Sequence, residues 1–153
     1  LYFDQDIESA DRYLLDSVRT QNINERLFAT EVIADTGVPH FSGYLVELLE
    51  DIDPLIVERA IVAAGNLHDP RLINILVKKF AIASLQRATK LSLRHFGEAA
   101  LYDLDTGLTS PEATRQEKNH IIETIKEIGG RQAIEILLRH LEIALPELRH
   151  MVL

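Results

Sequence analysis

Residues 54–80 read PLIVERAIVAAGNLHDPRLINILVKKF, and other parts of the chain repeat the pattern of this stretch. In its first half, apolar residues recur at the i, i+3, i+4, i+7 spacing that places them on one face of a helix, and the second half does the same. Between the halves, Asp69 can accept hydrogen bonds from the free N–H groups of a new helix, and Pro70 loses nothing there by lacking its own. The stretch therefore predicts a helix, a tight turn and a second helix.

The same pattern recurs at a nearly constant spacing. Pro39 precedes Pro70 by 31 residues, Asp69 precedes Gly97 by 28, and Gly97 precedes Gly130 by 33. A helix pair that repeats at about 30 residues is typical of an α-solenoid, in which neighbouring pairs cover each other's apolar faces. The expected elements are an N-terminal helix at 5–19, helix pairs at approximately 23–50, 54–80, 85–108 and 115–142, and a truncated helix at 146–153.

The predicted fold of residues 1–153 is a single all-α domain, a right-handed α-solenoid of stacked antiparallel helix pairs with about ten helices. An ordinary helical bundle is the alternative, and the constant spacing favours the solenoid. The longest irregular stretch is expected at 105–115, where Ser110 and Pro111 could begin the next helix. Residues expected in the core include Ala64, Ile125 and Leu137, with two apolar stripes, Leu85, Ala88, Leu91 and Ser92 in one helix and Ile134, Leu137, Leu138 and Leu141 in another.

The composition suits a folded domain in a reducing compartment. The chain has 153 residues, enough for a sizeable core, and its net charge of −8 disfavours binding to the nucleic acid backbone. Without Cys, disulfides, thiolate metal sites and cysteine nucleophiles are excluded. No apolar run approaches the roughly 18 to 20 residues that span a bilayer, and no secretory signal is visible. We expect a cytoplasmic protein, or a cytosolic part of a longer chain at a membrane.

No motif predicts catalysis, a cofactor or a metal. The acidic run ELLEDID at 47–53 is interpreted as a solvated helix end in which Asp53 caps the helix beginning at Pro54, because a catalytic dyad needs two carboxylates held across a pocket. The six histidines contain no i, i+3 or i+4 pair of the kind that presents two ligands on one helix, so we interpret them as turn and surface residues. They are His40, His68, His95, His120, His140 and His150.

The repeated segments resemble the HEAT-like repeat family, especially its short bacterial form. The segment VERAIVAAGNLHDPRLINILVKKF at 57–80 has Arg and Ala in the first helix, Ala-Gly near its end and Asp-Pro-Arg at the turn. The first pair departs from the family because Gly37-Val38-Pro39 replaces the Asp-Pro turn. Segments that resemble the repeat at matching phases are FGEAAL at 96–101, IGGRQAIEILL at 128–138 and PELRHMVL at 146–153.

This resemblance implies a non-catalytic scaffold that binds another protein or another domain of its own longer chain. As the alternative, the run from Arg94 to Leu153 is similar to HEAT-like modules of bacterial membrane transporters that resemble nucleotide (ATP/ADP) translocases, where it would be a cytosolic regulatory domain. The chain begins without Met and ends on the apolar Met151, Val152 and Leu153. We therefore expect a piece of a longer protein, whose C-terminal end pairs weakly with another copy.

A basic segment supplies the predicted partner-binding surface. No acidic residue lies between Asp69 and Glu98. The same segment contains six basic residues, which are Arg71, Lys78, Lys79, Arg87, Lys90 and Arg94. Arg87, Lys90 and Arg94 share one helical face through their i, i+3, i+7 spacing. We expect this strip to dock an acidic protein segment, a nucleotide-bearing domain or anionic lipid headgroups, because Arg forms paired hydrogen bonds with carboxylate or phosphate. The alternative is a solvated face whose charge is balanced by Glu side chains of neighbouring helices.

Overall fold

A computed structural model describes residues 2–143, with side chains described from residue 8 to residue 141. Every regular element in this range is a helix, which confirms the all-α prediction. The helix expected at 146–153 lies outside the described residues. The chain divides into two compact units, Leu1–Leu72 and Ile73–Leu153, and each is described by itself below. The boundary falls inside the stretch 54–80, so the two helices of that predicted pair belong to different units.

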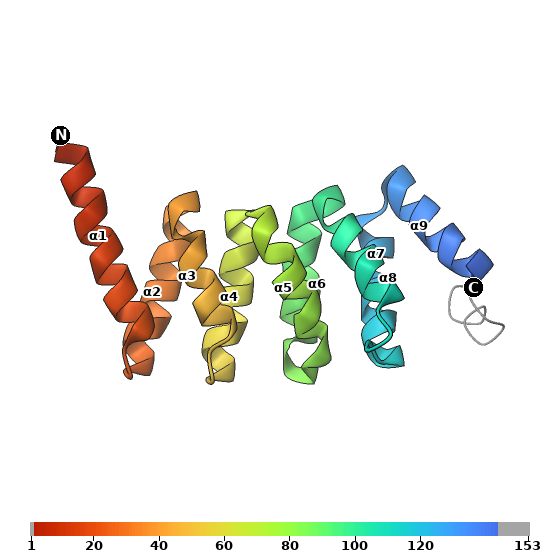
Figure 1. Cartoon of the computed structure of the whole chain (residues 1–153), viewed down its shortest axis with the longest axis horizontal. Helices are drawn as coiled ribbons and strands as arrows, with labels where there is room; N and C mark the ends of the chain where they lie inside the picture. The colour runs from red at the N-terminus through yellow and green to blue at the C-terminus, as the bar shows by residue number, and fades with distance from the viewer. Residues whose placement is uncertain (1, 144–153) are drawn as a thin grey trace. The chain divides into compact units, whose positions relative to one another are not determined.

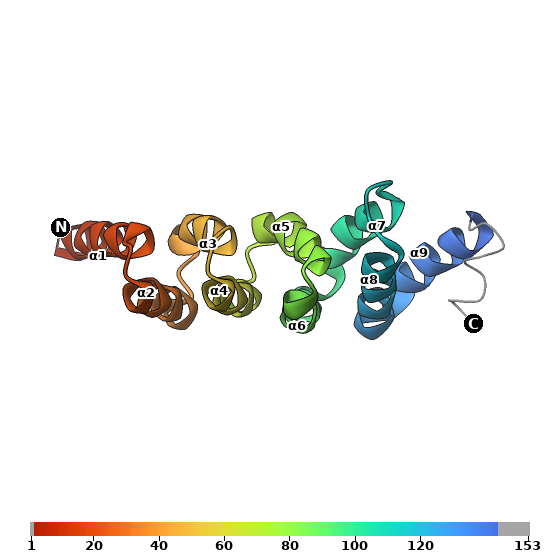
Figure 2. The same ribbon diagram turned by 90° about the horizontal axis from the view of Figure 1, so that it is seen from below.

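The first unit contains α1 (Tyr2–Arg19), α2 (Ile23–Thr36), α3 (Ser42–Leu49) and α4 (Pro54–Leu67), with 3-10 turns at Pro39–Phe41 and Pro70–Leu72. Within it, α1 and α3 lie in one layer and α2 and α4 in the other (Figure 1 and Figure 2). Helix α4 packs against both α2 and α3. Ala64 is buried as predicted. The largest fully buried side chains of this unit are Ile33, Leu45, Leu48, Leu49, Ile56, Ile61 and Leu72.

Polar caps explain where the helices of the first unit begin. The Asn22 side chain accepts a hydrogen bond from the backbone of Asn24 at the start of α2. Asp53 caps α4 in the same way, as predicted, with Pro54 at the first helical position. The predicted Asp-Pro turn is also present, because Asp69 Oδ1 accepts a hydrogen bond of 3.0 Å from the Arg71 backbone. Each cap satisfies an N–H group that has no partner inside the helix.

The second unit contains α5 (Ile73–Lys78), α6 (Gln86–Phe96), α7 (Leu101–Thr109), α8 (Arg115–Ile128) and α9 (Gly130–Ile143), with 3-10 turns at Lys79–Ala81, Ala83–Leu85 and Gly97–Ala100. Within this unit, α5 and α7 form one layer and α6 and α8 the other (Figure 2). Helix α9 packs against α7 and α8. The largest fully buried side chains of this unit include Ile73, Leu76, Phe80, Leu93 and Leu101.

Helix α7 makes an unusually close approach to its neighbours at Gly107. A Cβ atom at this position would lie 3.0 Å from both Val77 Cγ1 of α5 and Ile121 Cδ1 of α8. Helical glycine normally costs about 1 kcal/mol relative to Ala, so its presence here needs a packing reason. The absent side chain is what lets the three helices meet.

Two apolar stripes differ from the predicted phase. Of the first stripe, Leu85, Ala88 and Ser92 are buried as predicted, but Leu91 in α6 is 44% exposed. Thr89 is buried instead, because α5 and α8 cover its side of α6. In α9, Ile134 and Leu138 are exposed, and Leu137 is only half-buried. Helices α7 and α8 and the 3-10 turn Gly97–Ala100 contact α9, and among its described side chains Ala133 and Ile136 are the buried ones instead. Ile125 is buried as predicted.

The loop before α8 is shorter than expected. Helix α7 continues to Thr109, and α8 begins at Arg115, where the expected pair 115–142 starts, so Ser110 and Pro111 do not begin the helix. Instead, Thr114 Oγ1 accepts a hydrogen bond from the Glu117 backbone, and Glu117 Oε2 accepts one of 2.7 Å from the Thr114 backbone. This reciprocal capping box satisfies two N–H groups at once, which a Ser-Pro start does not offer.

Candidate functional site

The six basic residues of the predicted docking strip are divided between the two units. Arg71 belongs to the first unit, and the other five belong to the second. Lys78 and Arg87 are exposed, as the prediction requires. Lys79 is only 7% exposed, so it lacks the exposure that the docking prediction assumes. The reason is the 3-10 turn Lys79–Ala81, which changes the direction of successive side chains at the end of α5.

Lys90 and Arg94 form ion pairs with carboxylates of α8. Lys90 Nζ lies 3.1 Å from Glu127 Oε1 and 3.5 Å from Glu123 Oε2, and Arg94 Nη1 lies 3.2 Å from Glu127 Oε2. The hydrogen bond to Glu127 is the largest cause of the raised pKa of Lys90. This is the arrangement that the alternative interpretation expects, a basic face balanced by Glu side chains of a neighbouring helix. Partner binding by the strip stays a prediction.

Arg71 is held in place by the turn that it follows. Its Nη2 donates hydrogen bonds of 2.6 Å to Asp69 Oδ2 and 2.7 Å to Ser42 Oγ, and its Nε lies 3.0 Å from both Asp69 oxygens. The Arg71 side chain is 75% exposed, whereas that of Asp69 is 8% exposed. Hydrogen bonds from Arg71, and secondarily from Ser42, hold the pKa of Asp69 well below its ordinary range. The cluster links the turn after α4 to the start of α3.

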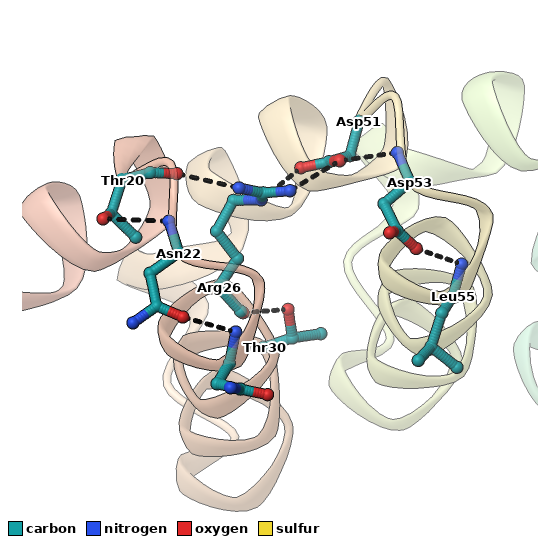
Figure 3. Close-up of polar contacts among 8 residues, drawn as sticks. Thr20, Asn22, Arg26, Thr30, Asp51, Asp53 and Leu55 are labelled. Atoms are coloured by element: carbon teal, nitrogen blue, oxygen red, sulfur yellow. Dashed lines mark hydrogen bonds and ion pairs between the residues drawn. The ribbon is translucent and has the colours of Figure 1, made fainter.

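The acidic run at 47–53 has three different environments. Glu47 forms an exposed pair with Arg19, Asp53 caps α4 as predicted, and Asp51 pairs with Arg26 in α2. Figure 3 shows Arg26 reaching from α2 to the loop between α3 and α4. Arg26 Nε lies 2.9 Å from Asp51 Oδ2, and the two side chains are 12% and 11% exposed. The interpretation of the run as wholly solvated is therefore wrong for Asp51.

Besides pairing with each other, Arg26 and Asp51 each form one hydrogen bond with the backbone. Arg26 Nη1 donates a hydrogen bond of 2.8 Å to the carbonyl of Thr20, and Asp51 Oδ1 accepts one of 2.8 Å from the Asp53 backbone N–H (Figure 3). The pair therefore fastens the loop between α1 and α2 to the loop between α3 and α4. The sequence analysis did not predict this ion pair. The signal that could have indicated it is an acidic and a basic residue that each lie close to a recurring turn.

A third polar cluster joins α1 to the start of α3. Asp11 Oδ1 accepts a hydrogen bond of 2.7 Å from the Tyr44 hydroxyl and lies 3.1 Å from His40 Nε2. Burial, with a smaller contribution from this hydrogen bond, raises the pKa of Tyr44 to about 12. Among the described residues, no group of three or more His, Asp or Glu side chains could hold a metal ion. His150 lies outside them.

A hollow between α2 and α4 was not predicted. Its volume is about 220 Å³, and its lining residues are Thr30, Glu31, Ala34, Asp35, Arg59, Val62 and Ala63. The buried Thr30 and Ala63 form its floor, and Val62 at its rim is 46% exposed. Phe28 and Leu55 are also exposed on these two helices. Little in the amino-acid pattern indicates this surface, because single apolar residues outside a core stripe are common on protein surfaces.

Helical spacing aligns these residues on the outer side of each helix. In α2, Phe28 and Asp35 are seven residues apart and therefore share a face, and in α4 the same holds for Leu55 and Val62. Figure 3 shows that α2 and α4 begin on the same side, and residues of both helices line the hollow. The surface is called the α2–α4 face below, and it consists of the lining residues of the hollow with Phe28 and Leu55.

A second groove lies between α7 and α9 in the other unit. Its volume is about 460 Å³, and it is lined by Tyr102, Asp105, Gln132, Glu135, Ile136 and Arg139. Most of its charged groups already have partners. Asp105 contacts both Arg139 and His140, with 2.7 Å to His140 Nε2, and Glu135 lies 2.9 Å from Arg131 Nε.

Comparison with known proteins adds no family assignment, since no family model and no curated protein matches this chain. Within the described part of the chain, no helix is both long enough and apolar enough to cross a membrane.

Proposed function

We propose that this chain is a non-catalytic interaction scaffold that binds another protein, or another domain of its own longer chain. In this proposal its helix pairs form a right-handed, HEAT-like solenoid. The order of packing supports it, because in each unit a helix contacts mainly the helices one and two places away along the chain. A surface assembled from successive helices is preorganised, which lowers the entropy cost of binding.

The observation that carries the proposal is the α2–α4 face. Phe28, Leu55 and Val62 are 51%, 44% and 46% exposed on two helices that pack side by side, and Val62 lines the hollow between these helices. Apolar side chains grouped on neighbouring elements and edged by charged residues mark protein interaction sites, whereas scattered ones do not.

Affinity capture with a matched pair of variants tests the proposal. Val62→Glu changes the α2–α4 face, and Val46→Glu makes the same change on α3 of the same unit, where Val46 is 40% exposed. The bait is the full chain, and captured proteins are identified by mass spectrometry. We expect one or more proteins to be retained by wild type and by Val46→Glu but lost with Val62→Glu. Equal capture by both variants would mean that this face is not the binding surface.

A further inference from the structure

The hollow in the α2–α4 face is the size of one large side chain rather than of a metabolite. Its 220 Å³ lies below the roughly 300 to 1,000 Å³ of small-molecule pockets. Ala34, Val62 and Ala63 supply its apolar lining, and the Thr30 hydroxyl already donates a hydrogen bond of 2.8 Å to the Arg26 carbonyl. A leucine, methionine or phenylalanine side chain suits such a hollow.

The charges around the hollow favour a cationic occupant. Glu31 and Asp35 line it from α2, and Arg59 is the basic residue that lines it from α4. Glu58, beside Arg59, is also exposed and adds negative charge to the outer side of α4. Within the described part of the chain, neither Glu31 nor Asp35 takes part in an ion pair or a side-chain hydrogen bond. Two carboxylates are thus available to a partner.

These carboxylates occupy a place where they do not stabilise the helix. Asp35 lies in the last turn of α2, Glu31 lies one turn earlier, and the last turn contains no basic residue. The C-terminal end of a helix carries partial negative charge, so acidic groups there are unfavourable and basic groups favourable. Stability of α2 therefore does not explain the two acids, whereas a bound cation would neutralise them.

We propose that this hollow receives one apolar side chain of a partner protein segment in which lysine or arginine flanks the apolar residue. The apolar side chain fills the hollow, and the flanking cations pair with Glu31 and Asp35. This inference rests on the proposed scaffold function and states the chemistry of the partner. A second copy of this chain is a poor occupant, because it brings a net charge of −8 to an acidic rim.

Three fluorescent peptides of equal length test this chemistry against the full 153-residue chain. One carries a central Leu between Lys residues, the second replaces that Leu with Ser, and the third keeps Leu but replaces the Lys residues with Glu. Fluorescence anisotropy at low salt should show the Leu–Lys peptide binding about tenfold more tightly than either of the others. Its affinity should fall as salt is added, because exposed charges are screened.

A matched pair of charge reversals locates the site. Glu31→Lys with Asp35→Lys, and Glu8→Lys with Asp16→Lys on the exposed side of α1, each change the net charge from −8 to −4. The α2 double variant should bind the Leu–Lys peptide about tenfold more weakly, and the α1 variant should bind it nearly as wild type does. The melting temperature of the α2 variant should not fall, because Lys suits the last turn of a helix. Ala34→Met, which fills the hollow without changing charge, should also weaken binding.

Each contrary result overturns the inference. Equal weakening by both double variants would show that the peptide responds to net charge alone. Equal binding of the Leu and Ser peptides would show that the hollow receives no side chain, and no binding of the Leu–Lys peptide at low salt would remove the proposed chemistry. If Val62→Glu still abolishes capture of a partner in any of these cases, the scaffold function stands and only the chemistry of its partner is wrong.

Discussion

A buried ion pair in the first unit contrasts with a surface network of ion pairs in the second. In the first, Arg26 and Asp51 form one pair that is close to nine-tenths buried and joins two interhelical loops. In the second, Lys90 and Arg94 share carboxylates of α8 on the surface, where the Arg94 and Glu127 side chains are 45% and 37% exposed. The two sets of ionic groups are similar in chemistry but differ in their exposure to solvent.

The difference in solvation decides what each contact contributes. An exposed pair gains little from its Coulomb attraction, because water already stabilises both ions. A buried pair need not stabilise much as a whole either, but losing one partner leaves a charge without water. We therefore expect the first unit to be sensitive to single substitutions at its pair and the second unit to be tolerant.

The largest effect is expected for Asp51→Ala. This change leaves the Arg26 guanidinium largely buried and without its carboxylate, which should lower the free energy of unfolding by about 3 to 5 kcal/mol. Urea denaturation followed by circular dichroism measures it. The double variant Arg26→Met with Asp51→Ala should recover part of the loss. A cost below about 1 kcal/mol for Asp51→Ala would mean that the buried pair contributes no more to stability than an exposed one.

Substitutions of apolar residues in the second unit show how much loss of burial alone costs, for comparison with the ion-pair variants. Ile125 in α8 is fully buried, so Ile125→Ala should cost about 2 to 5 kcal/mol through lost burial and the cavity left behind. Leu137 is only half-buried, and Leu137→Ala should cost less in the same denaturation experiment. If the two costs were reversed, the phase assigned to α9 would be wrong.

Asp69 should make stability depend on pH. The hydrogen bonds from Arg71 lower its folded pKa from the ordinary value of 3.8, so its contribution is complete above about pH 4 and disappears as the pH falls through the lowered value. At pH 7, Asp69→Asn should lose about 1.5 to 3 kcal/mol, the usual worth of hydrogen bonds to a charged group. Denaturation curves at pH 7 and pH 2.5 should show a smaller difference between wild type and variant at the lower pH. A difference independent of pH would rule out this role.

The smallest effect is expected for Glu127→Gln. The variant loses the ion pairs of Lys90 and Arg94 but keeps the volume of the side chain, so the cost should be about 0.2 to 1 kcal/mol. Added salt should reduce it further. A salt-independent cost above about 2 kcal/mol would show that the surface network behaves like the buried pair.

The sequence predicted what depends on neighbours along the chain. Helix ranges and the caps at Asp53 and Asp69 could be found because spacing and turn chemistry are local. The prediction failed where packing against other helices decides which residues are covered, as in α6, where Thr89 is buried and Leu91 is exposed.

The candidate site was harder to predict than the fold. The hollow needs two helices whose outer faces run alongside each other, and no pattern within one helix shows that. The ion pair between Lys90 and Glu127 was equally difficult to predict, because the two residues are 37 positions apart in the sequence.

The close approach at Gly107 should restrict which residues related chains carry at this position and at its two neighbours in space. A methyl group there would press on Val77 of α5 and Ile121 of α8 at the same time. Related chains that carry Ala at this position should therefore carry a smaller side chain at one of the other two, so that the three positions vary together. In a library that varies position 107 alone, glycine should be strongly selected, and a library that varies all three should recover larger residues there.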